Sequence, residues 1–225
     1  MTVIRGRFGS ETTETRWAAA EDAFAAGDAG SALGIFADLA DKGEWLAYVE
    51  VGNLLEMGPP GVEKNIERAL YWYRKAVFES DDPNAHFALA RLYFNGQETS
   101  LDHTMARHHV EKALSAPAPY QLSDHYRAMA YVMLGNIHAR GLGVAKDVKK
   151  ARQALEEGTE AGYLWPMFEL SNLELRSWHF FKGLRLRFRA SRIAGSLLTK
   201  NPNDPRLIGL NVPQALKRRV QATRS

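Results

Sequence analysis

The stretch LGNIHARGLGVAKDVKKARQAL, residues 134–155, is the most informative part of the sequence about the fold of this chain. It joins two segments of helix-favouring residues through a loop that contains Gly141 and Gly143. Glycine readily adopts the left-handed backbone that ends many helices, so these glycines predict the end of a first helix. Asp147 belongs to the residue types favoured at helix N-caps, which predicts a second helix that starts at Val148. The stretch therefore predicts a helix, a loop and a second helix.

The start of this stretch recurs along the chain. Four segments align with one another, residues 51–58, 89–96, 134–141 and 170–177, and their second positions all hold small residues: Gly52, Ala90, Gly135 and Ser171. These positions are 38, 45 and 36 residues apart, and the first three segments end in Gly58, Gly96 and Gly141. A period of this length is typical of helical repeat arrays, in which stacked units build one continuous core.

A second pattern follows each of these segments. Two small residues stand seven positions apart, in the pairs Ala69 and Ala76, Ala106 and Ala113, Ala151 and Gly158, and Gly183 and Ala190. Seven residues are about two helical turns, so both members of a pair lie on one face of a helix. Small side chains on that face allow a neighbouring helix to approach closely. Each unit is therefore predicted to contain a helix A, a loop and a helix B.

An incomplete unit precedes these four. Residues 17–26 are rich in alanine, Gly27 and Asp28 interrupt them, and a helix-favouring segment then continues to Gly43. We expect a helical array over residues 17–195, with units near 17–46, 47–84, 85–129, 130–165 and 166–195. Residues 1–16 are expected to be a flexible N-terminus, and residues 196–225 a basic C-terminal cap or tail. Atypical outer units are usual in such arrays, because one of their faces meets solvent.

The third unit carries the fullest pattern: Leu134-Gly135, Gly141-Leu142-Gly143-Val144, Lys146-Asp147, Lys150-Ala151 and Gly162. This pattern resembles the Sel-one-like repeat, a branch of the tetratricopeptide-like superfamily, whose second helix is matched by Ala69, Trp72, Tyr73, Lys75 and Ala76. The fourth unit departs from the pattern, because Ser171 replaces the first glycine and the glycine loop is missing. The resemblance implies an all-α fold, an α-solenoid of about five stacked antiparallel helix pairs in a right-handed superhelix.

The same resemblance implies a function. Proteins that resemble this family commonly bind a protein or peptide in the concave groove of the array, so we expect a non-enzymatic scaffold or adaptor. The first helices would line that groove, and four of their residues directly follow the small positions: Asn53, Arg91, Asn136 and Asn172. These four are the candidate binding residues, with the alternative that they merely face solvent.

Charge is distributed unevenly along the chain. The formal net charge is +3, but residues 1–175 hold 17 basic and 25 acidic residues, whereas residues 176–225 hold 12 basic residues and the single acid Asp204. The repeat register favours a helix over residues 178–193, on which Lys182, Arg185, Arg189 and Arg192 form a basic stripe. Phe181, Leu184 and Phe188 form its apolar side, which Leu198 would extend beyond residue 193. A short helix over residues 214–222 would add Lys217, Arg218 and Arg219 to the basic surface.

Three interpretations of this basic segment remain open. It packs on the protein's own acidic array or solubilises its terminal cap. Alternatively, it binds an acidic protein partner or an anionic membrane surface. Binding to nucleic acid is the least favoured interpretation, because contacts to phosphates need only lysine and arginine but none of the usual nucleic-acid-binding signatures is present.

Other classes of site lack their sequence signatures. The chain has no cysteine, which excludes disulfides, thiolate zinc sites and cysteine nucleophiles. It also has no HExxH motif, P-loop, dinucleotide fingerprint or Gly-x-Ser-x-Gly elbow, so we expect no metal, no cofactor and no catalysis. Two groups are interpreted as solvated helix residues: His103, His108, His109 and His125, and Glu156, Glu157 and Glu160. Without a secretory signal pattern or 18 uninterrupted apolar residues, we expect no transmembrane segment and a cytoplasmic location.

Overall fold

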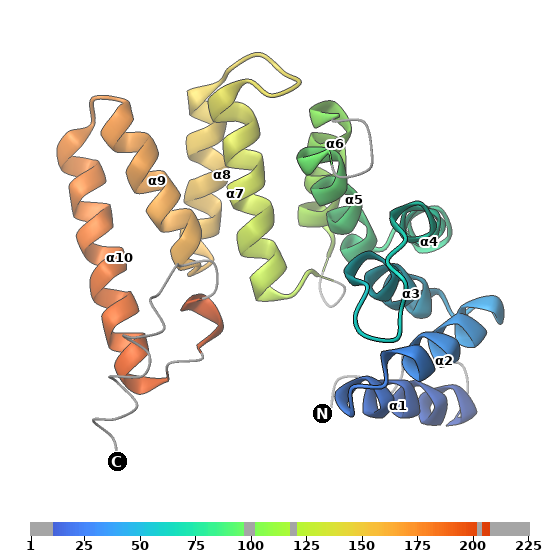
Figure 1. Ribbon diagram of the computed structural model, residues 1–225. Helices are drawn as coiled ribbons and strands as arrows, with labels where there is room; N and C mark the ends of the chain where they lie inside the picture. The colour runs from blue at the N-terminus through green and yellow to red at the C-terminus, as the bar shows by residue number, and fades with distance from the viewer. Residues whose placement is uncertain (1–10, 97–101, 118–120, 202–203, 208–225) are drawn as a thin grey trace. The chain divides into compact units, whose positions relative to one another are not determined.

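The computed structural model describes residues 11–96, 102–117, 121–201 and 204–207, and over these residues the fold is all-α (Figure 1). Its elements are, in chain order, α1 (Glu11–Ala25), α2 (Ala29–Asp41), α3 (Trp45–Met57), α4 (Ile66–Ser80), α5 (Pro83–Asn95), α6 (His103–Ser115), α7 (Asp124–Arg140), α8 (Val148–Glu160), α9 (Leu164–Arg176), α10 (Phe180–Lys200) and the 3-10 helix η1 (Pro205–Leu207). The predicted all-α succession of helix pairs is confirmed. Residues 1–10 of the expected N-terminus and the helix expected over residues 214–222, with its three cations, lie outside the described residues.

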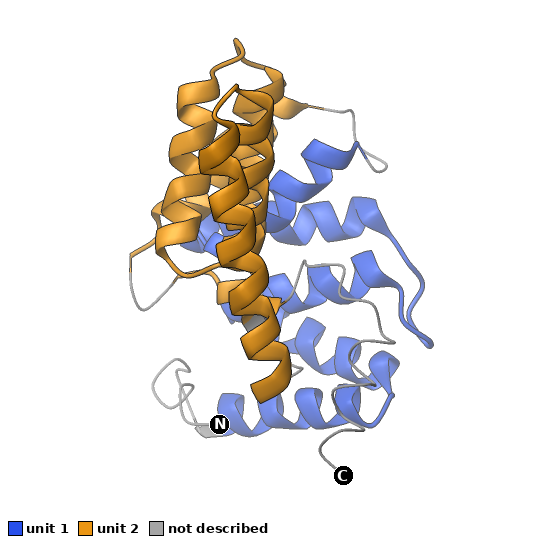
Figure 2. Ribbon diagram, turned by 90° about the vertical axis from the view of Figure 1, so that its left-hand side faces the viewer, with its two compact units in different colours: residues 1–101 blue, residues 102–225 orange. Residues whose placement is uncertain are grey.

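The chain divides into two units, residues 1–101 and residues 102–225 (Figure 2). Unit 1 contains α1 to α5, and unit 2 contains α6 to α10 and η1. Within each unit consecutive helices pack against one another, and in unit 2 α7 also packs against α9. The predicted boundaries of the individual repeats stay predictions, although the observed helix pairs follow their order.

In unit 1, Gly52 explains how α3 and α4 come together. The side chain of Tyr73 on α4 is fully buried, and a Cβ atom added to Gly52 would lie 2.5 Å from its Cε1 atom. Such a distance is far inside van der Waals contact, so the ring fits only against glycine. Ala69 and Ala76, the small pair predicted on helix B, are fully buried as well. The small residues therefore allow a large aromatic ring to fill the space between two closely packed helices.

In unit 2, glycine allows close packing of paired helices in two different arrangements. A Cβ atom at Gly135 of α7 would lie 2.8 Å from the side chain of Leu155 on α8, which repeats the arrangement of unit 1. In the last helix pair, the glycine is instead on the second helix, where a Cβ atom at Gly183 would lie 2.9 Å from the carbonyl oxygen of Ser171. The buried hydroxyl of Ser171 donates a hydrogen bond of 2.9 Å to the carbonyl oxygen of Gly183. The atypical Ser171 thus faces a glycine across the helix contact.

The helix ends agree with the turn residues of the sequence. Oδ1 of Asp147 accepts hydrogen bonds from the backbone N–H groups of Lys149 (2.9 Å) and Lys150 (3.0 Å), so α8 starts at Val148 as predicted. Asp82 caps α5 in the same way, with Pro83 as the first helical residue. The glycines that end the first helices, Gly58, Gly96 and Gly141, all have left-handed backbones.

Candidate protein-binding surfaces

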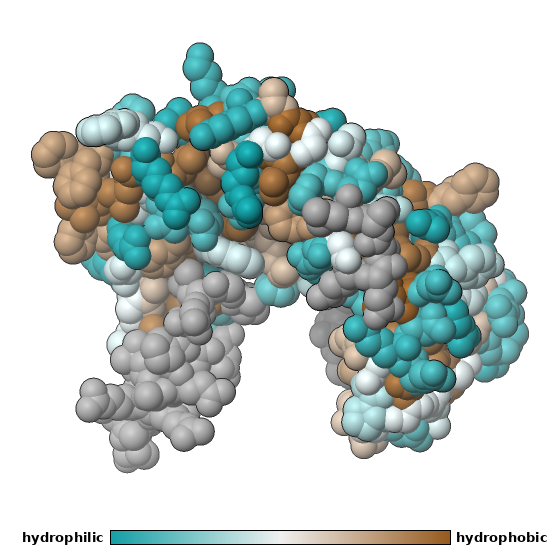
Figure 3. Space-filling model, turned by 45° about the horizontal axis from the view of Figure 1, so that its top comes forward, coloured by the Kyte–Doolittle hydropathy of each residue, from teal (hydrophilic) through white to brown (hydrophobic). Residues whose placement is uncertain are grey.

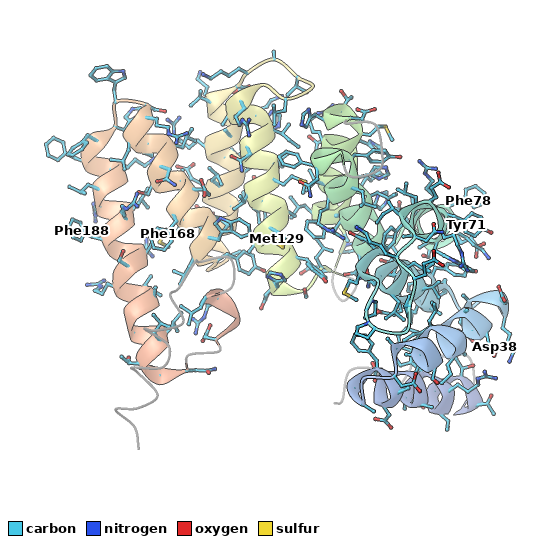
Figure 4. The ribbon with its side chains drawn as sticks, in the orientation of Figure 1. Asp38, Tyr71, Phe78, Met129, Phe168 and Phe188 are labelled. Carbon is cyan, nitrogen blue, oxygen red and sulfur yellow. The ribbon has the colours of Figure 1, made fainter. Side chains whose placement is uncertain are left out.

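Asn136 and Asn172 lie on the first helices α7 and α9 of unit 2, which pack against each other. Met129 precedes Asn136 by seven residues and Phe168 precedes Asn172 by four, so each apolar side chain shares a helix face with an amide. All four residues are half-buried, and Figure 4 labels Met129 and Phe168 on their helices. We call these four residues the amide face.

The two amides of this face differ in their hydrogen bonds. Oδ1 of Asn172 accepts a hydrogen bond of 3.0 Å from the guanidinium group of Arg187, and its Nδ2 atom lies 3.5 Å from a carboxylate oxygen of Glu169. The side chain of Asn136 has no hydrogen-bond partner among the residues that the structure describes. An asparagine amide carries a donor and an acceptor, the two groups that a peptide backbone also presents. The amide face can therefore hold a peptide backbone while Met129 and Phe168 contact apolar side chains.

The two candidates of unit 1, Asn53 and Arg91, contribute to one internal network. The guanidinium group of Arg91 on α5 forms an ion pair with the buried carboxylate of Glu56 on α3, with Nη2 2.6 Å from Oε2. The hydroxyl of Tyr73 lies 2.9 Å from Oδ1 of Asn53 and 2.9 Å from Oε2 of Glu56. Burial, and then the nearby Glu56 carboxylate, raises the pKa of Tyr73, so its hydroxyl stays protonated and donates. Asn53 and Arg91 therefore already have partners inside unit 1.

Unit 2 contains a second buried carboxylate, Glu174, whose side chain is 0% exposed. Nε of Arg152 on α8 lies 2.8 Å from Oε1, Nζ of Lys182 on α10 lies 2.9 Å from the same oxygen, and Nδ1 of His179 lies 3.1 Å from Oε2. Burial alone would raise the pKa of Glu174, but the hydrogen bonds from Arg152 and Lys182 outweigh burial and hold that pKa below its usual value. The ionised Glu174 thus links three helices of unit 2.

Neither Glu56, Tyr73 nor Glu174 was among the candidates that the sequence suggested. Glu56 and Arg91 are 35 residues apart on different helices, and no local sequence pattern predicts such an ion pair. The only available signal was indirect: each carboxylate stands near the end of a first helix, three or four positions after the small residue of its segment.

The face that α10 buries differs from the predicted one. Phe181 and Phe188, expected on the apolar packing side, are 85% and 69% exposed. The helix instead packs through Gly183, Ala190 and Ala194, which are buried, because α9 approaches the backbone of α10 too closely for a large side chain. Leu198, also expected on the apolar side, is buried as predicted. The basic stripe Lys182, Arg185, Arg189 and Arg192 is exposed along its whole length.

The histidines that were interpreted as solvated helix residues differ in their burial. His108 is exposed, but His109 is buried, so the expectation that all four histidines are solvated is wrong at this position. His109 stands three residues after Ala106, the same offset that places the buried Ala154 after Ala151. Among the described residues, no group of three or more histidine, aspartate and glutamate side chains is arranged to hold a metal ion.

Unit 2 also contains a pocket of about 520 Å³ between α6, α7, α8 and the loop after α7. Burial and the nearby charge of Lys150 lower the pKa of His138 at this pocket, which favours its neutral form. Cations and anions balance one another around the pocket: Arg107, Lys146 and Lys150 against Glu111, Asp147 and Glu157. Arg107 pairs with Glu111, and Asp147 caps α8, so three of these charged groups already have partners inside unit 2.

The helices follow one another in tandem pairs, and small residues lie where paired helices pack closely. This arrangement is typical of α-solenoid repeat proteins. The family model of the Sel1 repeat matches residues 45–77, 83–116 and 128–163, which fall on helices α3 and α4, α5 and α6, and α7 and α8. The chain contains three Sel1 repeats, as its resemblance to the Sel-one-like repeat predicted. Sel1 repeat proteins are typically scaffolds for protein–protein interaction.

Proteins similar to this chain include two relatives and one solved structure. An uncharacterized protein of Neisseria meningitidis is 34% identical over 125 residues, and the ERAD-associated E3 ubiquitin-protein ligase component HRD3B of Arabidopsis thaliana is 32% identical over 113 residues. These matches cover 56% and 50% of this chain but only 23% and 16% of the relatives. The crystal structure of a Sel1 repeat protein from Oxalobacter formigenes superposes with a TM-score of 0.64, covers 96% of this chain and 90% of its own, and is 21% identical. That likeness shows the α-solenoid fold.

Proposed function

We propose that this protein is a non-enzymatic scaffold that binds a segment of a partner protein on the amide face of unit 2. The observation that carries the proposal is the pairing of two half-buried apolar side chains, Met129 and Phe168, with two amides on neighbouring first helices. Apolar contact supplies affinity, and the amides supply hydrogen bonds that fix the direction of a bound backbone.

The choice of unit 2 over unit 1 follows from the hydrogen bonds. Arg91 and Asn53 are held by Glu56 and Tyr73, so a partner would have to compete with internal bonds to reach them. Asn136 has no such competitor among the described residues, and Nδ2 of Asn172 has only a contact of 3.5 Å. A peptide that binds Asn136 therefore displaces only water and breaks no internal hydrogen bond of the protein.

The proposal is tested with peptides selected on the full chain from a random phage-displayed library. We expect the selected peptides to bind about 5-fold more weakly to Asn136→Ala, because one hydrogen bond is lost at a cost of about 1 kcal/mol. The double variant Asn136→Ala/Asn172→Ala should bind more weakly still. The matched control is Gln153→Ala, which removes an exposed amide from the second helix α8 and should leave the dissociation constant unchanged.

Calorimetric titration of each variant with the same peptides gives the dissociation constants. If the double variant binds as tightly as the unmodified chain, the amide face is not the binding site.

We also propose that this scaffold is located in the cytoplasm, because its sequence shows no secretory signal pattern. Cell fractionation tests this location. No helix in the described part of the chain combines the length and apolar character needed to cross a bilayer.

A further inference from the structure

The corner between α9 and α10 exposes a cluster of aromatic side chains. Trp178 is 98% exposed, Phe180 56% and Phe181 85%, and Phe188 follows two turns later at 69%. Trp178 also has a left-handed backbone with φ of 63°, a conformation that is costly for a bulky residue and that is often retained at functional sites. Large exposed aromatic groups of this kind commonly mark an interaction surface.

Cations lie between these rings. Phe181, Arg185, Phe188 and Arg192 follow one another at intervals of four, three and four residues, so they share the side of α10 that faces away from α9. We call these four residues the α10 outer face. In Figure 4 Phe188 projects from α10 on the side away from α9, and in Figure 3 apolar side chains gather beside hydrophilic ones at this edge of the molecule.

The positive charge of this surface is only partly neutralised within the described residues. Lys182 forms ion pairs with Glu156 (3.1 Å) and Glu174 (2.9 Å), so it belongs to the internal network. Arg185, Arg189 and Arg192 are exposed and have no ion-pair partner among the described residues. No aspartate or glutamate occurs between Glu174 and Asp204. A groove of about 730 Å³ runs beside these three arginines, with Lys182, Leu186 and Phe188 completing its lining.

We infer that the α10 outer face, together with Trp178 and Phe180, docks this protein on the surface of an anionic lipid bilayer. Tryptophan and phenylalanine are favoured at the boundary between headgroups and acyl chains, and arginine is attracted by lipid phosphates. A bilayer combines both kinds of site and is fluid, so it can receive rings that project from a convex corner. A folded acidic protein would need a preformed pocket for each ring. This surface is separate from the amide face, so a bilayer and a protein partner could be held at the same time.

The test uses vesicle flotation with the full chain, comparing vesicles of phosphatidylcholine alone with vesicles that contain equal parts of phosphatidylglycerol. We expect binding only to the anionic vesicles, weakening as salt rises, because the cations are exposed. Replacing the three free arginines, in Arg185→Gln/Arg189→Gln/Arg192→Gln, should weaken binding by roughly 100-fold, since each basic residue near the surface contributes about 1 kcal/mol.

The aromatic variant Trp178→Ala/Phe181→Ala/Phe188→Ala should lose binding with little change in salt dependence. These side chains are exposed, so circular dichroism should show an unchanged helix content. Its matched control is Phe78→Ala on α4, where a ring that is 90% exposed stands next to Glu79 and has a single arginine, Arg74, one turn before it. Phe78→Ala should bind vesicles like the unmodified chain.

Fluorescence gives an independent readout of the same contact. Lipids brominated near the headgroup should quench emission of the unmodified chain on anionic vesicles, and Trp178→Phe should abolish that quenching while flotation is largely retained. The inference is overturned if anionic vesicles fail to bind, if Phe78→Ala weakens flotation as much as the aromatic triple variant, or if the surface binds only acidic peptides or DNA. Peptide binding at the amide face should be unaffected by these variants, so failure here is distinguishable from failure of the scaffold proposal.

Discussion

Glu56 in unit 1 and Glu174 in unit 2 are both buried carboxylates near the end of a first helix, yet they recruit their cations from different places. Glu56 is paired by Arg91, which lies on the first helix of the next pair. Glu174 is paired by Arg152 from the second helix of the preceding pair and by Lys182 from its own second helix. The carboxylates therefore determine which polar residues remain available to partners.

In unit 1 the internal pair takes the arginine that the sequence suggested for the groove, and Tyr73 takes the neighbouring asparagine. In unit 2 the internal pair takes one cation of the basic stripe and leaves Arg185, Arg189 and Arg192 without a described partner. Asn136 is left without one as well. Buried carboxylates, which no sequence motif marks, therefore decide which polar residues form internal ion pairs and hydrogen bonds. The remaining polar residues are available to bind a partner.

The largest expected effect comes from removing these carboxylates. Glu174→Ala should lower the free energy of unfolding by about 3 kcal/mol, because removing one partner of a buried ion pair leaves the other charges uncompensated. Glu56→Ala should cost less, about 2 kcal/mol, because it leaves a single cation, Arg91, without its carboxylate. Urea denaturation followed by circular dichroism measures both, and equal losses would contradict the ranking.

The pH dependence provides a control for the role of Glu174. Its pKa is depressed in the folded protein, so its contribution to stability is fully present above the pKa of the unfolded carboxyl and is lost as pH falls through the folded value. Below about pH 4.3, the unperturbed value, the unmodified chain should therefore lose more stability than Glu174→Gln does. A parallel acid dependence of the two proteins would show that Glu174 is not held ionised by its partners.

Next in size are the small residues that close the helix contacts. Gly183→Ala should destabilise by about 2–3 kcal/mol, because its Cβ atom would meet backbone atoms of α9 that cannot move independently. Gly135→Ala should cost about 1 kcal/mol, because the obstacle is the end of the flexible Leu155 side chain. Gly195→Ala on the solvent side of α10 is the matched control and should be neutral or stabilising, since nothing lies near its Cβ position. Thermal unfolding of the three variants gives the order directly.

The smallest effects distinguish the asparagines of the two units. Asn53→Ala should cost about 1 kcal/mol of stability, because Tyr73 loses one of its two hydrogen-bond acceptors. Asn136→Ala should change stability by less than about 0.5 kcal/mol, as expected for a side chain without internal partners. If Asn136→Ala proves to be the more damaging of the two in urea denaturation, Asn136 is a structural residue and the amide face loses its main support.

Much of the fold could be predicted because its signals are local. Asp147 and Gly141 fix helix ends through hydrogen bonds and backbone conformations that span only a few residues, so their positions could be inferred from sequence alone. The small residues Gly52 and Gly135 could also be noticed in the sequence, because the need for close packing recurs with the repeat.

The site could be predicted only in part, because its decisive contacts are not local. The pairing of Arg91 with Glu56 depends on how neighbouring helices stack, which no single repeat encodes. The error on α10 had another cause: hydrophobicity pointed to Phe181 and Phe188 as the packing side, whereas Gly183 and Ala190 already marked that side by their small size. For this helix, close approach outweighed the burial of large apolar side chains.

The most direct test of the account is the side-chain amide signal of each asparagine in a nitrogen–proton correlation spectrum, recorded while a selected peptide is added. The signals of Asn53, Asn136 and Asn172 are assigned by their loss in the corresponding alanine variants. We expect the Asn136 and Asn172 signals to shift with the peptide while the Asn53 signal, held by Tyr73, stays in place. A shift of Asn53 without a shift of Asn136 would contradict the assignment of binding to the amide face.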